Sequence, residues 1–170
     1  DNNGNRLMDD EGESLARVDG RHLTINMCTD SSGGVFVTWQ DKRNLLDDDI
    51  YGTHVSASHD IVAPETGVAI IEMNGNQGAK SLEYAGNGQA ILLWSDTRSG
   101  AGNDIYGQKI NMDMSKVFAD DGLPIAVTSE LETKPRTTYM SNDTSFVVWQ
   151  SGIESSDIYF NFLTSNGLVF

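Results

Sequence analysis

Two pairs of charged residues occupy equivalent places in a repeated pattern and are the first candidates for chemistry. Asp41 and Arg43 follow one apolar run, and Asp96 and Arg98 follow another 55 residues later. An acid and a guanidinium two residues apart share a face of a continuing strand, where they could bind an ionic ligand. Alternatively, the aspartate caps its loop while the arginine packs on a tyrosine or pairs with an acid. We favour this structural interpretation because the pairs recur periodically, whereas a catalytic site needs asymmetry.

The densest carboxylate cluster is Asp47-Asp48-Asp49. Calcium takes about six to eight oxygen ligands, which a loop rich in Asp and Asn could provide. The EF-hand pattern, Asp-x-Asp-x-Asp-Gly with a distant Glu, is absent. The corresponding loops keep only the last aspartate, as Asp104 and Asp157. A residue that closes a hairpin explains this pattern better, and calcium is the one cofactor that remains a possibility, at Asp47, Asp48 and Asp49.

Three tryptophans recur every 55 residues, each at the end of an apolar run and each followed by Asp-Ile-Tyr. They are Trp39, Trp94 and Trp149, with Tyr51, Tyr106 and Tyr159 in the following motifs. Exposed tryptophans could stack on sugar rings. The runs are apolar on both faces, however, which favours packing between sheets. We therefore expect the six aromatic residues to form the structural core of the repeats.

Catalysis has little support in the sequence. The lone Cys28 gives no disulfide and no metal motif. His22, His54 and His59 show no metal-binding spacing, and the sialidase motif Ser-x-Asp-x-Gly-x-Thr-Trp is absent. Any two of the many carboxylates could be chosen as a glycosidase pair, which is not support. A secreted glycan-acting hydrolase or lyase, with its site on the loop face, remains the competing hypothesis.

The acidic composition excludes several classes of partner. Eleven basic and 25 acidic residues give a net charge of −14, which repels nucleic acid and anionic membranes. The sequence contains no apolar run of about 18 residues or more, so membrane insertion is not expected. Asp1 is not an initiator methionine, so we expect a chain that is processed or excised from something longer.

The repeat extends over the whole chain. Glycines 12, 67 and 122 follow the same 55-residue period as the tryptophans. The chain is therefore predicted to be a single repeat domain with units at 1–55, 56–110 and 111–163, and residues 164–170 begin a fourth unit. Self-similarity at such a period is typical of repeat architectures.

Each unit is predicted to contain four or five short strands. Apolar runs precede the tryptophans at 35–38, 90–93 and 146–148, and a second strand begins at each Asp-Ile-Tyr, giving 50–55, 105–110 and 158–163. A further strand comes before each tryptophan strand, at 23–27, 79–84 and 135–139. A weaker pair surrounds each periodic glycine, at 7–8 with 15–17, 60–62 with 68–71, and 117–118 with 125–127. We predict an all-β fold of three four-stranded blade-like repeats, β-propeller-like and either partial or completed by oligomerisation, with a β-solenoid or sandwich array as the alternative.

The pattern of an apolar run, Trp-x-Asp-x-Arg, a loop and Asp-Ile-Tyr-Gly-Gln, most complete from Trp94 to Gln108, resembles a repeat of large secreted bacterial proteins. Units of that family stack into β-propellers. A looser similarity exists to the propeller repeats of the Tol-system periplasmic protein. The resemblance implies an architecture and an extracellular, cell-surface or periplasmic location. Unit three departs from it, because Ser151, Ile153 and Phe160 replace the Asp, the Arg and the Gly.

Our leading functional hypothesis is a non-catalytic extracellular or cell-surface module that presents a rigid surface to a protein or polysaccharide. Three blades do not normally close a ring. We therefore expect self-association or the remainder of a larger propeller. Residues 4–17 could also pair with strands of the last unit and close the array.

Overall fold

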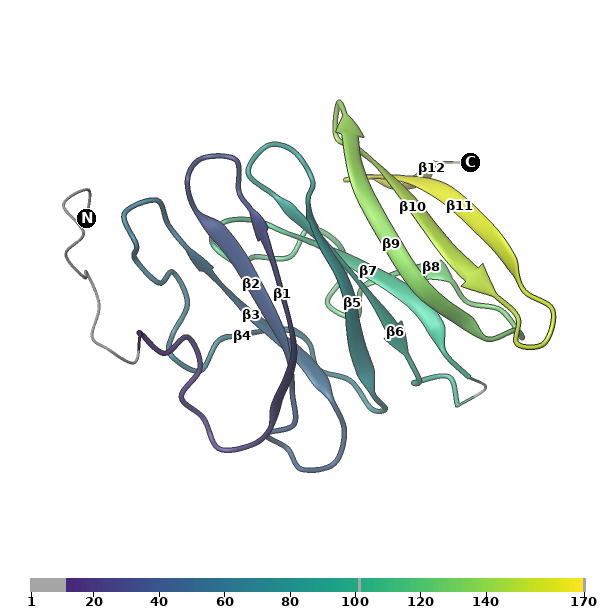
Figure 1. The fold of residues 1–170 in the computed structure, drawn as a ribbon, viewed down its shortest axis with the longest axis horizontal. Coiled ribbons are helices and arrows are strands. Elements are labelled where there is room, and N and C mark those ends of the chain that lie inside the picture. Colours follow the sequence, from purple (N-terminus) through teal and green to yellow (C-terminus); the bar gives the residue numbers. More distant parts are fainter. Residues whose placement is uncertain (1–11, 101, 170) are drawn as a thin grey trace.

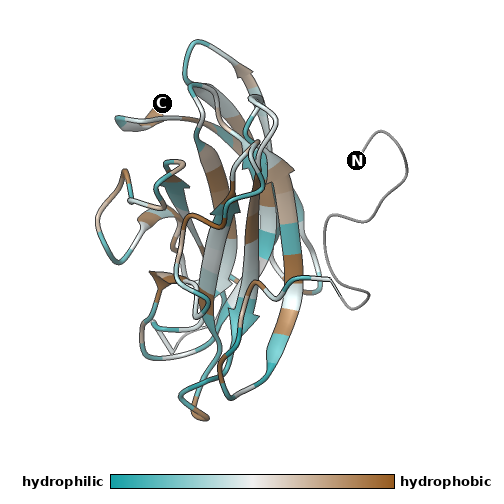
Figure 2. Ribbon diagram, turned by 90° about the vertical axis from the view of Figure 1, so that its left-hand side faces the viewer, coloured by the Kyte–Doolittle hydropathy of each residue, from teal (hydrophilic) through white to brown (hydrophobic). Residues whose placement is uncertain are grey.

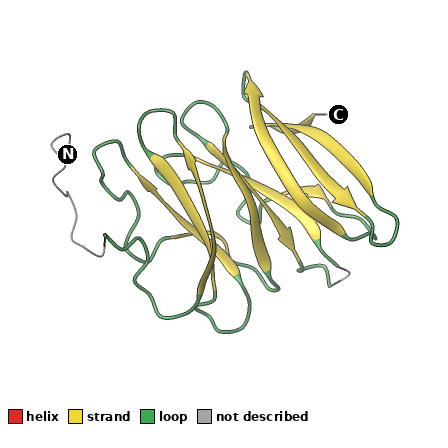
Figure 3. Ribbon diagram, viewed as in Figure 1, coloured by secondary structure: helices red, strands yellow, loops and turns green. Residues whose placement is uncertain are grey.

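The chain folds into three antiparallel sheets of four strands each, placed side by side (Figure 1). The structure is a computed structural model that describes residues 12–100 and 102–169. Every regular element in these residues is a strand, and loops connect them (Figure 3). The all-β prediction is confirmed.

The twelve strands follow the chain without crossing between sheets. The first sheet contains β1 (His22–Thr29), β2 (Val35–Asp41), β3 (Asp49–Val55) and β4 (Val68–Ile71). The second contains β5 (Gln77–Tyr84), β6 (Ala90–Asp96), β7 (Asp104–Ile110) and β8 (Leu123–Ala126). The third contains β9 (Glu132–Ser141), β10 (Thr144–Ser151), β11 (Asp157–Thr164) and β12 (Gly167–Val169). Within each sheet, neighbours in sequence are neighbours in space.

Apolar residues on both faces of the tryptophan strands place those strands between layers. In β6, Ile91, Leu92, Leu93 and Trp94 have no exposed surface, because the second sheet is covered by the first and the third. Figure 2 shows hydrophobic segments along the strands, with hydrophilic segments between them and in many of the loops. A strand buried on both faces reads as a continuous apolar run, as β6 does.

Two hydrophobic cores fill the spaces between the sheets. Between the first and second sheets, Phe36 and Ile50 pack in the same cluster as Leu92 and Trp94. The second core, between the second and third sheets, repeats this arrangement with Ile91, Ile105, Val147, Trp149 and Leu163. Each tryptophan of the second and third sheets thus faces the preceding sheet.

The first strands of the three sheets run along one another, β1 beside β5 and β5 beside β9 (Figure 1). Each sheet draws its strands from two sequence units, since β4 lies within 56–110 and β8 within 111–163. In both cases this fourth strand leads directly to the first strand of the next sheet. The segment that precedes β1 likewise leads directly to the first strand of a sheet.

That segment differs from the prediction. Residues 15–17 were expected to form a strand but have no strand structure, while residues 7 and 8 lie outside the described residues. A strand needs a neighbouring strand edge to pair with, and within the described residues this segment pairs with no strand. Leu15 and Ala16 instead pack on Val37, Trp39 and Tyr51.

The short strands expected at 60–62 and 117–118 are also wrong. The structure has single bridges there, joining Val55 to Ile61 and Ile110 to Lys116. The strands that follow, β4 and β8, form the outer edges of their sheets as expected, with bounds that differ from the prediction by at most two residues.

Candidate functional site

Asp41 lies fully buried where β2 ends, and its carboxylate holds the following loop. Oδ2 accepts hydrogen bonds from Trp39 Nε1 at 3.0 Å and from Arg43 Nη2 at 2.5 Å. Oδ1 accepts from the backbone N and the Nε of Arg43, both at 2.9 Å. The guanidinium of Arg43 also lies 3.5 Å from the ring centre of Tyr51 and donates to the carbonyl of Thr66 at 2.8 Å. We refer to this set of contacts as the tryptophan–aspartate–arginine clamp.

The clamp keeps its acid ionised. Burial opposes the charge on Asp41, but hydrogen bonds from Arg43 and Trp39 outweigh it and lower the pKa of Asp41. The hydrogen bond to Asp41 raises the pKa of Arg43 in turn. A carboxylate held in this way is a poor general acid, because it does not carry a proton near neutral pH.

The second sheet repeats the clamp, except that Arg98 Nε makes no hydrogen bond where Arg43 Nε donates to its aspartate. Asp96 accepts from Trp94 Nε1 at 2.8 Å, from Arg98 N at 2.9 Å and from Arg98 Nη2 at 2.5 Å. Arg98 lies 4.1 Å from the ring centre of Tyr106 and donates to the carbonyl of Asp121 at 2.9 Å. The side chains of Asp41, Arg43, Asp96 and Arg98 are therefore held by contacts within the chain.

The third sheet retains the aromatic stack without the clamp. Trp149 and Tyr159 lie 6.1 Å apart with planes at 20°, as do Trp94 and Tyr106. Ser151, which replaces the aspartate, donates to Glu132 Oε1 at 3.1 Å. The aromatic contact is thus independent of the ionic one.

The Asp47-Asp48-Asp49 loop joins the first sheet to the second. Asp47 accepts from Gly75 N at 2.9 Å, and Asp48 N donates to Asn76 Oδ1 at 3.1 Å. Asp49 is buried and accepts from Asn44 Nδ2 at 3.0 Å. Its pKa is raised to about 6, first by burial and then by the charges of Asp47 and the more distant Glu72.

The structure does not assemble these acids into a metal centre. Within residues 12–100 and 102–169, no three His, Cys, Asp or Glu side chains are grouped as a metal site requires. In the same described ranges there is no helix that is long and apolar enough to cross a membrane.

A basic groove lies between the second and third sheets, and the sequence analysis missed it. Its cavity measures about 210 Å³ and is lined by three cations, Lys80 from β5 and Lys134 and Arg136 from β9. Arg136 Nη1 donates to the carbonyl of Lys80 at 3.2 Å, which joins the two strands. Ser95, Asn103 and Thr133 supply neutral polar groups to the same lining. The available signal was two alternating cations, Lys134-x-Arg136, in a strongly acidic chain.

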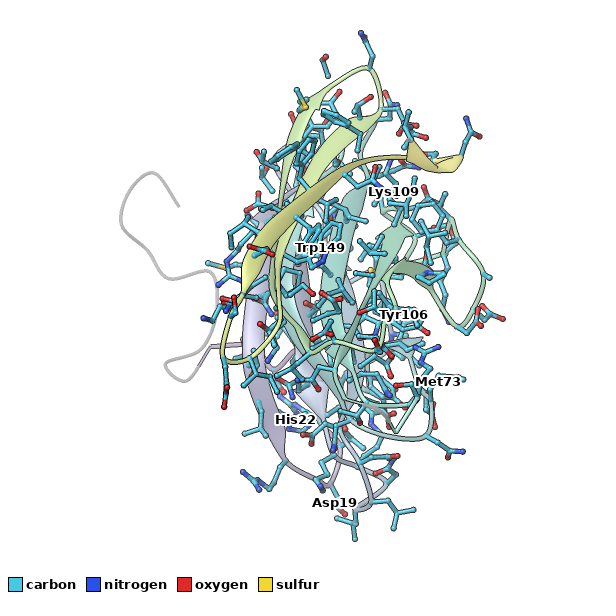
Figure 4. The ribbon with its side chains drawn as sticks, turned by 90° about the vertical axis from the view of Figure 1, so that its right-hand side faces the viewer. Asp19, His22, Met73, Tyr106, Lys109 and Trp149 are labelled. Carbon is cyan, nitrogen blue, oxygen red and sulfur yellow. The ribbon has the colours of Figure 1, made fainter. Side chains whose placement is uncertain are left out.

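A second link between these sheets joins β7 to the turn between β9 and β10. Lys109 is fully buried in β7 and pairs with Asp143 in the turn between β9 and β10. Figure 4 shows Lys109 in the upper part of the view and His22, which lies 3.4 Å from Asp41 of its own sheet, in the lower part. The pair of Lys109 with Asp143 and the hydrogen bond from Arg136 to the Lys80 carbonyl thus both link the second sheet to the third.

One solved structure similar to this chain is an endo-arabinase from Bacteroides thetaiotaomicron VPI-5482. The match has 14% sequence identity and a TM-score of 0.49, and it covers 79% of this chain and 54% of that chain. The chain thus spans about half the length of that protein. No protein-family model and no curated protein sequence matches the chain.

Proposed function

We propose that the chain is a non-catalytic, extracellular or cell-surface binding module of β-propeller-like sheets that binds an acidic glycan in the basic groove. The observation that carries this proposal is the groove itself. Three of only 11 basic residues, in a chain of net charge −14, meet in one cavity. Within residues 12–100 and 102–169, none of the three forms an ion pair with a carboxylate. Their charge is therefore available to a ligand.

The lining favours a sugar acid over a simple anion. Arg136 can bind a carboxylate through two parallel hydrogen bonds. Ser95, Asn103 and Thr133 can bond to sugar hydroxyls, as the few polar groups of a binding site do to fix a ligand's orientation. The location between two sheets linked by Lys109 and Asp143 supports a preformed site.

The competing hypothesis is a glycan-acting hydrolase or lyase. Glycoside hydrolysis generally uses two carboxyl groups that flank the scissile bond. The lining of the basic groove contains no carboxylate among the described residues. Asp41 and Asp96, the acids of the clamps, are committed to arginine and tryptophan. These observations favour binding without turnover.

The two hypotheses are separated by assaying binding and product release together. The protein is incubated with polygalacturonate, with neutral dextran and with polyglutamate, and reducing ends and unsaturated products are followed. We expect retention by polygalacturonate in affinity electrophoresis, weaker or no retention by the other two polymers, and no new reducing ends. Release of products would support the enzyme, and equal retention by dextran would exclude the charge-based site. Preferential retention by polyglutamate would point to an acidic protein partner instead.

A further inference from the structure

The outer strand of the third sheet leaves the first half of its neighbour unpaired on that side, whereas the outer strands of the other two sheets pair there. In the first sheet β4 pairs with Ile50 to Gly52 of β3, and in the second sheet β8 pairs with Ile105 to Gly107 of β7. In the third sheet β12 pairs only with the end of β11, from Phe162 to Thr164. The equivalent residues, Ile158, Tyr159 and Phe160, have no outer partner among the described residues and are 70%, 48% and 61% exposed.

A strand paired there would also cover a tryptophan. Gly67, before β4, lies so close to Trp39 that an added Cβ would stand 2.6 Å from the ring. Gly122, before β8, has the same relation to Trp94, at 2.5 Å. Among the described residues no glycine approaches Trp149 in this way, and Trp149 instead lines a cavity of about 470 Å³ together with Tyr159 and residues of β8.

The chain contains a third copy of that strand elsewhere. Gly12 is in the 55-residue series with Gly67 and Gly122 and has the same left-handed backbone, with φ of 82° against 70° and 82°. Nothing lies within 4 Å of the Cβ that a substitution at Gly12 would add. Leu15 and Ala16 follow at the spacing at which Ile70 and Ile71 follow Gly67. Among the described residues, one copy of the strand sequence therefore pairs with no sheet, and Trp149 lacks the glycine contact that Trp39 and Trp94 have.

The two ends of the stack are complementary in the same way. Ile158 is largely exposed, whereas its equivalents Ile50 and Ile105 are fully buried by the next sheet. At the other end, Met27 of β1 is 72% exposed, whereas its equivalent Leu82 is 5% exposed and packs on the first sheet. The outer faces of the third and first sheets are thus the two halves of an interface that the chain already forms twice.

We propose that a second copy of this chain completes the third sheet. Residues 12–17 of the second copy add to β11 as its outer strand, with Gly12 on Trp149, and the first sheet of that copy packs on the third sheet. The connection is feasible because this segment leads to β1 as β4 leads to β5. In the single chain Leu15 and Ala16 pack on Val37, Trp39 and Tyr51, as Ile70 and Ile71 pack in one cluster with Trp94, and the added strand keeps this packing. The contact that it gives up is the 2.8 Å hydrogen bond from Arg17 N to the Glu65 carbonyl. Reciprocal exchange between two copies gives a closed ring of six sheets with two-fold symmetry.

The mass of the protein in solution tests the proposal directly. We expect light scattering to give twice the chain mass of 18.5 kDa. Gly12→Ala should restore the single-chain mass, because the added Cβ meets the ring of Trp149 only in the dimer. Gly100→Ala is the matched control, since Gly100 also has a left-handed backbone, with φ of 71°, and open space around it. It should remain dimeric.

A disulfide identifies the occupant. Gly52 of β3 is the pairing partner of Val68 of β4. Phe160 is the equivalent of Gly52 and Glu13 is the equivalent of Val68, so Phe160 should pair with Glu13 of the added strand. In a Cys28→Ser background, oxidised Glu13→Cys/Phe160→Cys should run as a covalent dimer on a non-reducing gel. A single-chain mass with an intrachain disulfide would show that the chain's own segment closes the edge and would overturn the proposal. A mass that grows with protein concentration would indicate an open head-to-tail filament and would overturn the closed ring. If Gly12→Ala leaves the dimer intact and the two cysteines form no crosslink, the exchanged strand is overturned.

Discussion

At the scale of single residues, the recurring aspartates act inside the fold. Asp96 has no exposed surface and receives hydrogen bonds from the indole of Trp94 and from Arg98, whose side chain is 14% exposed. Removing one partner of a buried ion pair leaves an uncompensated charge, which costs more than the pair itself contributes. We therefore expect the aspartate and the arginine of a clamp to be lost together rather than singly. In the third sheet both are replaced, by Ser151 and Ile153.

We predict that Asp96→Ala lowers the free energy of unfolding by about 3–5 kcal/mol, because it strands the buried charge of Arg98. Urea denaturation measures the change. Asp120→Ala is the control, since Asp120 is 96% exposed beside Lys116 and its loss should leave the midpoint unchanged. Equal effects of the two substitutions would refute the role of the clamp.

Asp49 should make stability depend on pH. Its pKa in the folded state, about 6, is above the ordinary value of 3.8. The folded state therefore binds more protons than the unfolded state between these values, and the free energy of unfolding falls as pH rises from about 4 to 6. Asp49→Asn should be more stable than the parent at pH 7, by about 1–2 kcal/mol after discounting for screening, and equal to it below pH 4. Thermal melts across this range check the sign, with Asp60→Asn as an exposed control.

At the scale of elements, the glycines before β4 and β8 allow the outer strands to approach the tryptophans. Each has a left-handed backbone and faces an indole ring without room for a side chain. The approach brings the outer strand against the ring, so the tryptophan of one sequence unit and the glycine of the next form one contact within a sheet. This explains why both have the same period.

Gly122→Ala should therefore destabilise the protein by about 2–4 kcal/mol, from the strained backbone and the clash with Trp94 together. Gly100→Ala carries only the backbone term and should cost about 1 kcal/mol. The comparison is made by chemical denaturation. A similar loss of stability in both variants would mean that the clash with Trp94 does not contribute to the destabilisation by Gly122→Ala.

Most strands were predictable from the sequence because their patterns are local. The apolar runs before Trp39, Trp94 and Trp149 and the Asp-Ile-Tyr starts mark β2, β3, β6, β7, β10 and β11 to within a few residues. The strand predicted at 15–17 failed because pairing depends on a partner edge, which no local pattern encodes. The basic groove was missed for a related reason. Lys80 and Arg136 are 56 residues apart, and only the packing of β5 beside β9 brings them together.

At the scale of the whole molecule, the chain is a stack in which each sheet is stabilised by its neighbours. The stability of such an array is approximately the sum of unit and nearest-neighbour terms. The second sheet has two neighbours and the third has one, so equivalent residues contribute differently. Trp94 is fully buried, whereas Trp149 borders the open cavity.

We predict that Trp94→Ala costs about 3–5 kcal/mol and abolishes a single cooperative transition, because it weakens the sheet that joins the other two. Trp149→Ala should cost less and leave the first two sheets folded. Hydrogen exchange of backbone amides, resolved by sheet, distinguishes the two results. An unchanged melt of Trp94→Ala would refute the stacking account.

The central claim is that the protein binds an acidic glycan through its basic groove, and isothermal titration with oligogalacturonate tests it most directly. The parent should bind with an affinity that falls as salt rises. Lys134→Glu/Arg136→Glu should weaken binding at least tenfold, since each hydrogen bond to a charged group contributes about 1.5–3 kcal/mol. Lys116→Glu, outside the groove, should bind as the parent does. An affinity that is the same for the parent and the groove variant would contradict the claim.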